Sequence, residues 1–121
     1  MKILIVDDLK TERLLMRSYL EPRGFQILEA EDGETALALC ALEKPDLVLL
    51  DIVLPKADGF QVCRRIKRDP ELKATPVILV SSKTQESDRF WGLRQGASDY
   101  LNKPLQAAQV LSAVEKHLVP A

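Results

Sequence analysis

The sequence predicts an α/β fold built on a doubly wound, five-stranded parallel sheet with helices on both faces. Short apolar runs alternate with longer amphipathic segments five times along the 121 residues. This alternation is typical of a parallel sheet covered by helices. Three of the apolar runs are continuous, which indicates strands that are buried on both faces. Right-handed crossover connections make such a sheet doubly wound.

The five expected strands are short and differ in how apolar they are. They are Lys2–Asp7, Phe25–Ala30, Asp46–Asp51, Pro76–Ser81 and Ser98–Asn102. The first, third and fourth contain apolar runs without interruption, such as Ile3–Val6. The second and fifth strands are less apolar, which is typical of the edges of a sheet.

Five amphipathic segments between and after the strands are expected to be helices. They are Thr11–Leu20, Glu34–Glu43, a segment from Phe60 to Lys67, Ser87–Gln95 and Leu105–Leu118. Asp32 stands where an N-cap would start the second helix, Gly96 is a natural C-cap of the fourth, and Pro120 follows the last. A chain of this length fits one domain, which we expect to span residues 1–121.

Composition indicates an ordinary soluble globular protein, with 46% apolar and 29% charged residues. The formal net charge of -1 offers no basic surplus, so we expect no nucleic-acid partner. The apolar run Ile3–Val6 is too short to span a membrane or to serve a signal peptide. Cys40 and Cys63 form no metal-binding motif, so reduced core thiols in a cytoplasmic protein are expected.

Residues that can carry chemistry stand at the ends of the expected strands. Asp7 and Asp8 follow the first apolar run, Asp51 ends the third strand, Ser81 ends the fourth, and Lys103 follows the fifth. Ligands of doubly wound sheets bind outside the carboxyl ends of the strands, where the strand order reverses. In the flavodoxin-like order 2-1-3-4-5 this point lies between strands one and three. We therefore expect the three carboxylates to meet in one crevice.

Three carboxylates in one crevice repel each other. Each like-charged pair costs on the order of 4 kcal/mol at ~4 Å near a surface, so either one group binds a proton or a hard cation binds all three. Oxygen ligands with open positions for water suit Mg²⁺. A cation beside a carboxylate, with Lys103 and the Ser81 hydroxyl converging on the same space, fits phosphoryl transfer.

The same motifs give the chain a family resemblance. From end to end it resembles the receiver domain of bacterial two-component response regulators. The motifs are Ile5–Asp8, Leu50–Pro55, Asp58–Phe60, Val80–Ser82, Gly96–Tyr100 and Lys103–Pro104. Each motif alone is weak, and together, at this spacing, they are specific. The stretch from Ser82 to Pro104 is similar to single-domain regulators of type IV pilus twitching motility and their chemotaxis relatives.

The resemblance implies a role for each residue of the crevice. Asp51 would be the phosphoacceptor, and Mg²⁺ would be held by Asp7, Asp8, Asp51 and the backbone carbonyl of Val53. Lys103 would bind the phosphoryl group, and the family implies a cis bond between Lys103 and the following proline. The phosphoryl donor would be a partner histidine kinase or phosphotransfer protein.

The resemblance also implies a switch. Ser81 would move toward the phosphoryl group, and Tyr100 would turn inward into the space that is vacated. Val53 and Lys83 stand at the two positions that tune hydrolysis in the family. Because the apolar Val53 cannot orient a water molecule, we expect slow autodephosphorylation.

Output would be the binding of a target protein through the fourth helix, fifth strand and fifth helix, in motility or taxis. Arg89 and Leu93 are candidate partner contacts there, and equally residues of a solvated face. Trp91 could pack in the core or contact a partner. His117 is a charge-compatible residue near a helix C-terminus. The sequence leaves the kinase, the target and the oligomeric state open, as well as whether the chain is an excised domain.

Alternatives remain open at this point. The chain could be a phosphate sink that drains a kinase, although slow hydrolysis argues against that function. It could be a hydrolase that uses an aspartyl-phosphate intermediate, but such enzymes typically carry a second Asp where Val53 stands. A flavodoxin-like cofactor binder is disfavoured because carboxylates at the end of the first strand repel phosphate.

Overall fold

The computed structural model describes residues 1–82 and 86–118, and within these ranges it contains one five-stranded parallel sheet of order β2-β1-β3-β4-β5. The strands are β1 Lys2–Val6, β2 Gln26–Ala30, β3 Leu47–Asp51, β4 Val77–Ser81 and β5 Asp99–Asn102. The helices are α1 Lys10–Leu20, α2 Gly33–Glu43, α3 Gly59–Arg68, α4 Glu86–Arg94 and α5 Ala107–His117, with a 3-10 turn η1 Glu21–Arg23 after α1. The predicted α/β fold, its strand order and its edge strands are confirmed.

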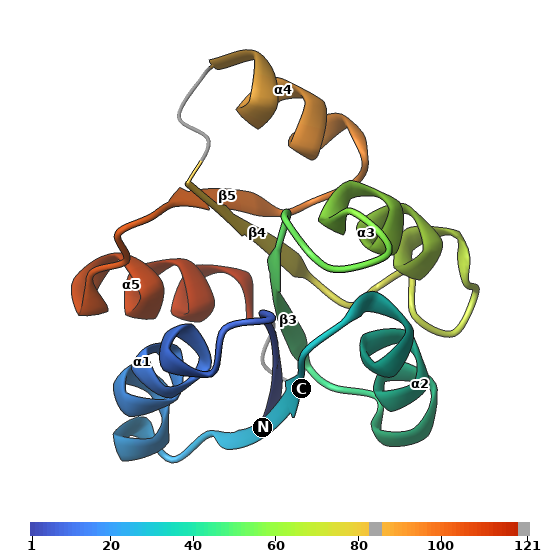
Figure 1. The fold of residues 1–121 in the computed structure, drawn as a ribbon. Helices are drawn as coiled ribbons and strands as arrows, with labels where there is room; N and C mark the ends of the chain where they lie inside the picture. Colours follow the sequence, from blue (N-terminus) through green and yellow to red (C-terminus); the bar gives the residue numbers. More distant parts are fainter. Residues whose placement is uncertain (83–85, 119–121) are drawn as a thin grey trace.

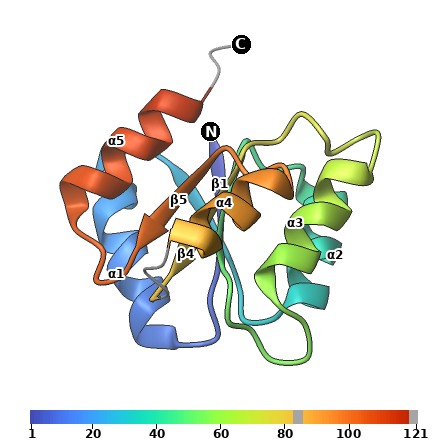
Figure 2. The same cartoon turned by 90° about the horizontal axis from the view of Figure 1, so that it is seen from above.

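Helices cover both faces of the sheet. Helices α1 and α5 lie against one face, and α2, α3 and α4 against the other (Figures 1 and 2). Alternate residues of each central strand point to opposite faces, so Ile3 and Ile5 join the core under α1 and α5 while Leu4 and Val6 join the other core. Both faces are therefore apolar, which explains the uninterrupted apolar runs.

Local signals act as expected at the helix ends. The Asp32 carboxylate accepts a hydrogen bond from the Thr35 N–H at 2.7 Å and caps α2. Gly96 adopts a φ of 100° after α4, in the left-handed region that favours glycine. The last helix begins two residues later than expected, because Gln106 is extended and acts as its N-cap. Leu105, expected in this helix, is instead a buried residue of the preceding loop.

Other expectations are met or lie outside the described residues. The bond between Lys103 and Pro104 is cis, and Cys40 and Cys63 are free and buried. In the part of the chain that is described, no helix is long and apolar enough to cross a membrane. Lys83 and Pro120 lie outside the described residues.

Candidate functional site

The site lies where β1 and β3 run side by side. Val6 pairs with Leu50, so Asp7 emerges beside Asp51 at the carboxyl end of the sheet. On the other side of β3, β4 and β5 end in register with Ser81 opposite Asn102, which directs Lys103 to the same edge. The strand order thus brings together residues from both halves of the chain.

Three carboxylates gather at this edge. Asp7, Asp8 and Asp51 each offer an oxygen, and these oxygens lie within 4.8 Å of one another. Asp7 is fully buried and Asp51 is 5% exposed, whereas Asp8 is open to solvent. Buried carboxylates are rare unless a cation compensates them. The predicted convergence of the three residues is therefore present in the structure.

Lys103 supplies one positive charge to this cluster. Its Nζ lies 3.0 Å from Asp7 Oδ2 and 3.6 Å from Asp51 Oδ2. Burial lowers the pKa of Lys103, but the hydrogen bond to Asp7 and the charge of Asp51 outweigh it, so the net shift is upward. The Lys103 backbone N–H donates to the Ser81 carbonyl at 2.8 Å, which anchors the lysine to the end of β4. The ammonium group therefore stays charged inside the crevice.

One ammonium group does not balance three carboxylates. Burial and the nearby charge of Asp7 raise the pKa of Asp51 to about 6, although Lys103 and a hydrogen bond from the Val53 backbone N–H oppose this shift. A raised pKa means that the folded protein resists the charged form of this group. The crevice is thus suited to an additional cation.

Three contacts besides the one from Lys103 hold Asp7 in place. Its backbone N–H donates to the Ala30 carbonyl at 3.1 Å, which extends the pairing with β2 beyond the end of β1. Its Oδ1 accepts a hydrogen bond from the Leu9 N–H at 2.9 Å. Its carbonyl oxygen accepts from Arg13 Nη1 at 2.6 Å. Sequence reasoning missed Arg13, because an arginine on an amphipathic helix has no local signal that separates it from a solvated residue.

Gly59 is a second residue whose role the sequence did not reveal. A Cβ atom at this position would lie 2.4 Å from the Asp51 carbonyl oxygen and 2.7 Å from Ile52 Cα. Its N–H donates to the Ile52 carbonyl at 2.7 Å. The first residue of α3 therefore packs directly on the backbone of Asp51, and only glycine fits there. Its place directly after Asp58, which caps α3, was the available signal.

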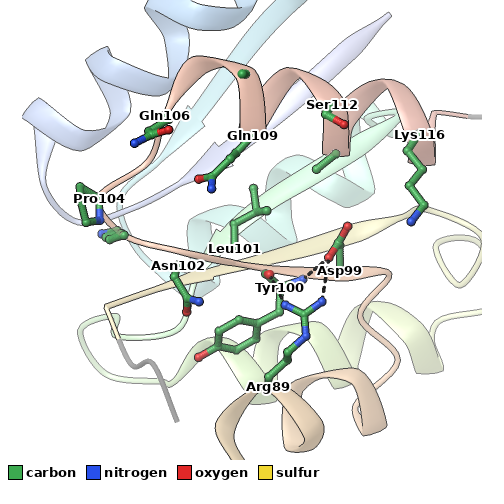
Figure 3. Close-up of a pocket in the computed structure, with 13 residues that line it drawn as sticks. Arg89, Asp99, Tyr100, Leu101, Asn102, Pro104, Gln106, Gln109, Ser112 and Lys116 are labelled. Carbon is green, nitrogen blue, oxygen red and sulfur yellow. Dashed lines mark hydrogen bonds and ion pairs between the residues drawn. The ribbon is translucent and has the colours of Figure 1, made fainter. Parts of the chain in front are cut away.

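Ser81, at the end of β4, and Tyr100, in β5, lie next to each other. Ser81 is fully buried and Tyr100 is 2% exposed. Burial raises the pKa of Tyr100, and a side-chain hydrogen bond with Ser81 opposes this shift. Figure 3 shows the Tyr100 ring on the α4 side of β5, opposite Leu101. Tyr100 thus occupies an inward position in this structure, and its movement on phosphorylation stays a prediction.

A family model described as a response regulator receiver domain matches residues 3–115. The chain belongs to this family. Receiver domains are signalling modules of two-component systems. Protein PilH of Pseudomonas aeruginosa is 49% identical over 113 residues, which cover 93% of each chain. The predicted resemblance to the type IV pilus and chemotaxis class of receivers is confirmed by this relative.

Solved structures of receivers share the fold. A response regulator from Chloroflexus aurantiacus has a TM-score of 0.93 and 31% identity, and the match covers 97% of this chain and 96% of the other. The Mn²⁺-bound form of response regulator Rcp1 has a TM-score of 0.85 and 28% identity, with 99% of each chain covered.

A groove of about 720 Å³ runs between α4, β5 and α5 of the receiver (Figure 3). Arg89, for which the sequence left a partner contact and a solvated position equally open, crosses from α4 and donates to the Tyr100 carbonyl at 2.9 Å. Asp99 lies 3.7 Å from Arg89 Nη2 and 3.1 Å from His117 Nε2, so it links α4 to α5. Leu93 and Trp91 are exposed on α4.

Proposed function

We propose that this receiver domain is a Mg²⁺-dependent phosphorylation switch that accepts a phosphoryl group on Asp51 from a histidine kinase or a phosphotransfer protein. The observation that carries the proposal is the position of Asp51. Its carboxylate is buried at the end of β3, 3.6 Å from the Lys103 ammonium group and beside Asp7 and Asp8. A nucleophile between a fixed cation and a set of metal ligands is the arrangement that phosphoryl transfer requires.

The donor set fits a magnesium ion. Carboxylate oxygens are the ligands that Mg²⁺ prefers, and burial together with the nearby charge of Asp7 raises the pKa of Asp51. We assign the ligands to Asp7, Asp8, Asp51 and the backbone carbonyl of Val53. The bound ion would neutralise charge on the phosphoryl oxygens. The Mn²⁺-bound form of Rcp1 supports a divalent cation in a receiver of this fold.

Asp51, Lys103 and Ser81 have different roles in the transfer of the phosphoryl group. A carboxylate oxygen of Asp51 attacks phosphorus, an acyl phosphate bond forms, and the bond between phosphorus and the donor breaks, with the electron pair leaving on the donor. At pH 7 Asp51 is mostly ionised, because its pKa of about 6 lies below that pH. Lys103 offsets the added negative charge, and the Ser81 hydroxyl donates a hydrogen bond to a phosphoryl oxygen.

The phosphorylated domain signals by binding a target protein in the groove between α4, β5 and α5. A charge-assisted hydrogen bond contributes about 1.5–3 kcal/mol, whereas a shift from 1:99 to 99:1 needs about 5.5 kcal/mol. The hydrogen bond from Ser81 therefore shifts the population only part of the way to the active state. Binding of the target supplies the remaining free energy. A free phosphorylated domain that is already fully active by NMR would contradict this partition.

Slow loss of the phosphoryl group fits a signal better than a phosphate sink. Val53 is 58% exposed beside Asp51, and its side chain has no polar group that could orient a water molecule. The protein also has Val53 at the position where an aspartyl-phosphate hydrolase typically carries a second Asp. The relation to PilH supports a role in pilus-driven motility or taxis, and we place the domain in the cytoplasm.

Intact mass after incubation with acetyl phosphate tests the proposal. The wild type is expected to gain one phosphoryl group in Mg²⁺ and none in EDTA, and Asp51→Asn is expected to gain none. Asp46→Asn is a matched control, because Asp46 precedes the same strand at its opposite end. Val53→Asn is expected to shorten the lifetime of the phosphorylated form. Gain of mass in Asp51→Asn, or no gain in any protein, would refute the proposal.

A further inference from the structure

Arg13 connects α1 to the loop that carries the carboxylates. It lies in the first turn of α1, and its side chain is 12% exposed. Its Nη1 donates to the Asp7 carbonyl oxygen at 2.6 Å, and its Nε donates to Glu29 Oε1 at 2.9 Å. One guanidinium group thus joins three elements of the fold: α1, β2 and the segment that follows β1.

The carbonyl that Arg13 binds belongs to the peptide unit between Asp7 and Asp8. A change in ψ of Asp7 or in φ of Asp8, the torsions that flank this peptide, would change the directions of the two side chains relative to Asp51. The Leu9 N–H holds the Asp7 carboxylate, but it is part of the same short turn and would move with it. Helix α1 has no side-chain N-cap that could fix the turn from the other end. Asp7 is also bonded to Ala30 through its N–H and to Lys103 through Oδ2, and Arg13 adds the contact that ties the carbonyl of this peptide to β2 through Glu29.

Glu29 fixes the arginine in turn. Burial raises the pKa of Glu29, but the hydrogen bonds from Arg13 and Arg17 together lower it by more, so the net shift of this pKa is downward. Glu29 remains a carboxylate and accepts Arg13 Nε on one oxygen and Arg17 Nη1 on the other, the latter at 2.5 Å. A planar guanidinium fork with two charge-assisted bonds has a defined orientation. Arg17 shares Glu29 with Arg13 and donates its second bond to Glu21.

We infer that Arg13, oriented by Glu29, is a positioning residue for the cation site. It sets the peptide between Asp7 and Asp8 so that both carboxylates converge on Asp51. The inference deepens the proposed function and rests on it, since Mg²⁺ is the ligand concerned. Residues that orient metal ligands through a hydrogen bond typically change metal affinity by about 10- to 100-fold when they are removed.

The experiment compares Arg13→Gln with Arg17→Gln. Both variants remove one arginine from Glu29, but only the first removes the donor to the Asp7 carbonyl. We expect Arg13→Gln to weaken Mg²⁺ binding by about tenfold in calorimetric titration, and Arg17→Gln to change it less than about twofold. Urea midpoints measured without metal separate this effect from general destabilisation. Arg13→Lys keeps the charge without the fork, so it should not restore the affinity.

Backbone NMR of the metal-free proteins gives a second readout. The Asp8 and Leu9 amide signals should shift in Arg13→Gln and stay in place in Arg17→Gln. Equal Mg²⁺ affinities in the two variants, or full restoration by Arg13→Lys, would overturn the inference. If the wild type binds no Mg²⁺, the proposed function fails, and unmoved Asp8 and Leu9 amides in Arg13→Gln would then overturn the inference as well.

Discussion

The Lys103 ammonium group lies 3.0 Å from Asp7 Oδ2, although 96 positions of the sequence separate the two residues. Asp7 follows β1 and Lys103 follows β5, and β3 and β4 lie between these two strands in the sheet. The contact therefore spans the carboxyl end of the sheet above Asp51. It also means that the lysine binds one carboxylate oxygen of Asp7, a residue that we assign to Mg²⁺.

Removal of the lysine charge should affect stability and metal binding in opposite directions. Lys103→Met leaves the buried Asp7 without its ion-pair partner, so the free energy of unfolding in EDTA should fall by about 3 kcal/mol. Mg²⁺ should bind more tightly, because a competing cation is gone, while phosphorylation by acetyl phosphate should slow. Urea denaturation, calorimetry and intact mass measure the three effects. Lys116→Met, at an exposed position on α5, is the matched control, and weaker Mg²⁺ binding in Lys103→Met would contradict the prediction.

The raised pKa of Asp51 predicts a specific pH dependence without metal. Folding raises this pKa from 3.8 to about 6, so the stabilisation by protonation is fully present below 3.8 and is lost as the pH rises through 6. The unfolding free energy of the wild type relative to Asp51→Asn should therefore increase between pH 7 and pH 4.5, toward a limit of about 3 kcal/mol. Urea titrations of both proteins in EDTA measure this difference. A difference that stays flat, or decreases toward acid pH, would show that Asp51 is not desolvated as described.

Gly59 should tolerate no side chain. A Cβ atom there meets backbone atoms of Asp51 and Ile52, which cannot rotate away. Gly59→Ala should lower the free energy of unfolding by about 1–3 kcal/mol and slow phosphorylation of the displaced Asp51. Gly33→Ala is the matched control at the first residue of α2, where the nearest neighbour is a movable methyl group of Val62 at 2.8 Å. Equal effects of the two substitutions on phosphorylation would refute the role of Gly59.

The features that sequence reasoning predicted are those fixed by burial or by strand order. Ile3–Val6 reads as a doubly buried strand because each of its residues enters one of the two cores. Asp7 and Asp51 could be paired in advance, because the ends of neighbouring parallel strands meet at one edge. Neither feature depends on where a helix lies.

The features that it missed depend on how helices sit against loops. The contact of Arg13 with the Asp7 carbonyl requires the placement of α1, and the fit of Gly59 against Asp51 requires that of α3. Tyr100 is more buried than its edge strand predicts, because α4 approaches closely through Gly92; a Cβ atom there would lie 3.1 Å from the Tyr100 ring. No periodicity in the sequence encodes these distances.

Both cysteines should resist thiol reagents in the native protein. Burial raises the pKa of Cys40 and of Cys63 to about 11, and neither side chain is exposed to solvent. Labelling with iodoacetamide at pH 8 should therefore proceed only through opening of the fold, and it should accelerate in urea along the unfolding curve. Mass spectrometry of the labelled protein gives the rates, with the two positions resolved by peptide mapping. Rapid labelling of either cysteine in buffer would contradict the described packing.

The residues of the proposed switch come from the ends of four strands, and Lys103 is among the last of them to be synthesised. A nascent chain that has not yet released β5 from the ribosome holds Asp51 without its lysine and without a finished sheet around it. We expect Asp51 in such a chain to be an ordinary solvated carboxylate. If Asp51 is the phosphoacceptor as proposed, we expect competence for phosphorylation to begin only after Lys103 has joined the sheet, and truncated products of aborted synthesis to accept no phosphoryl group.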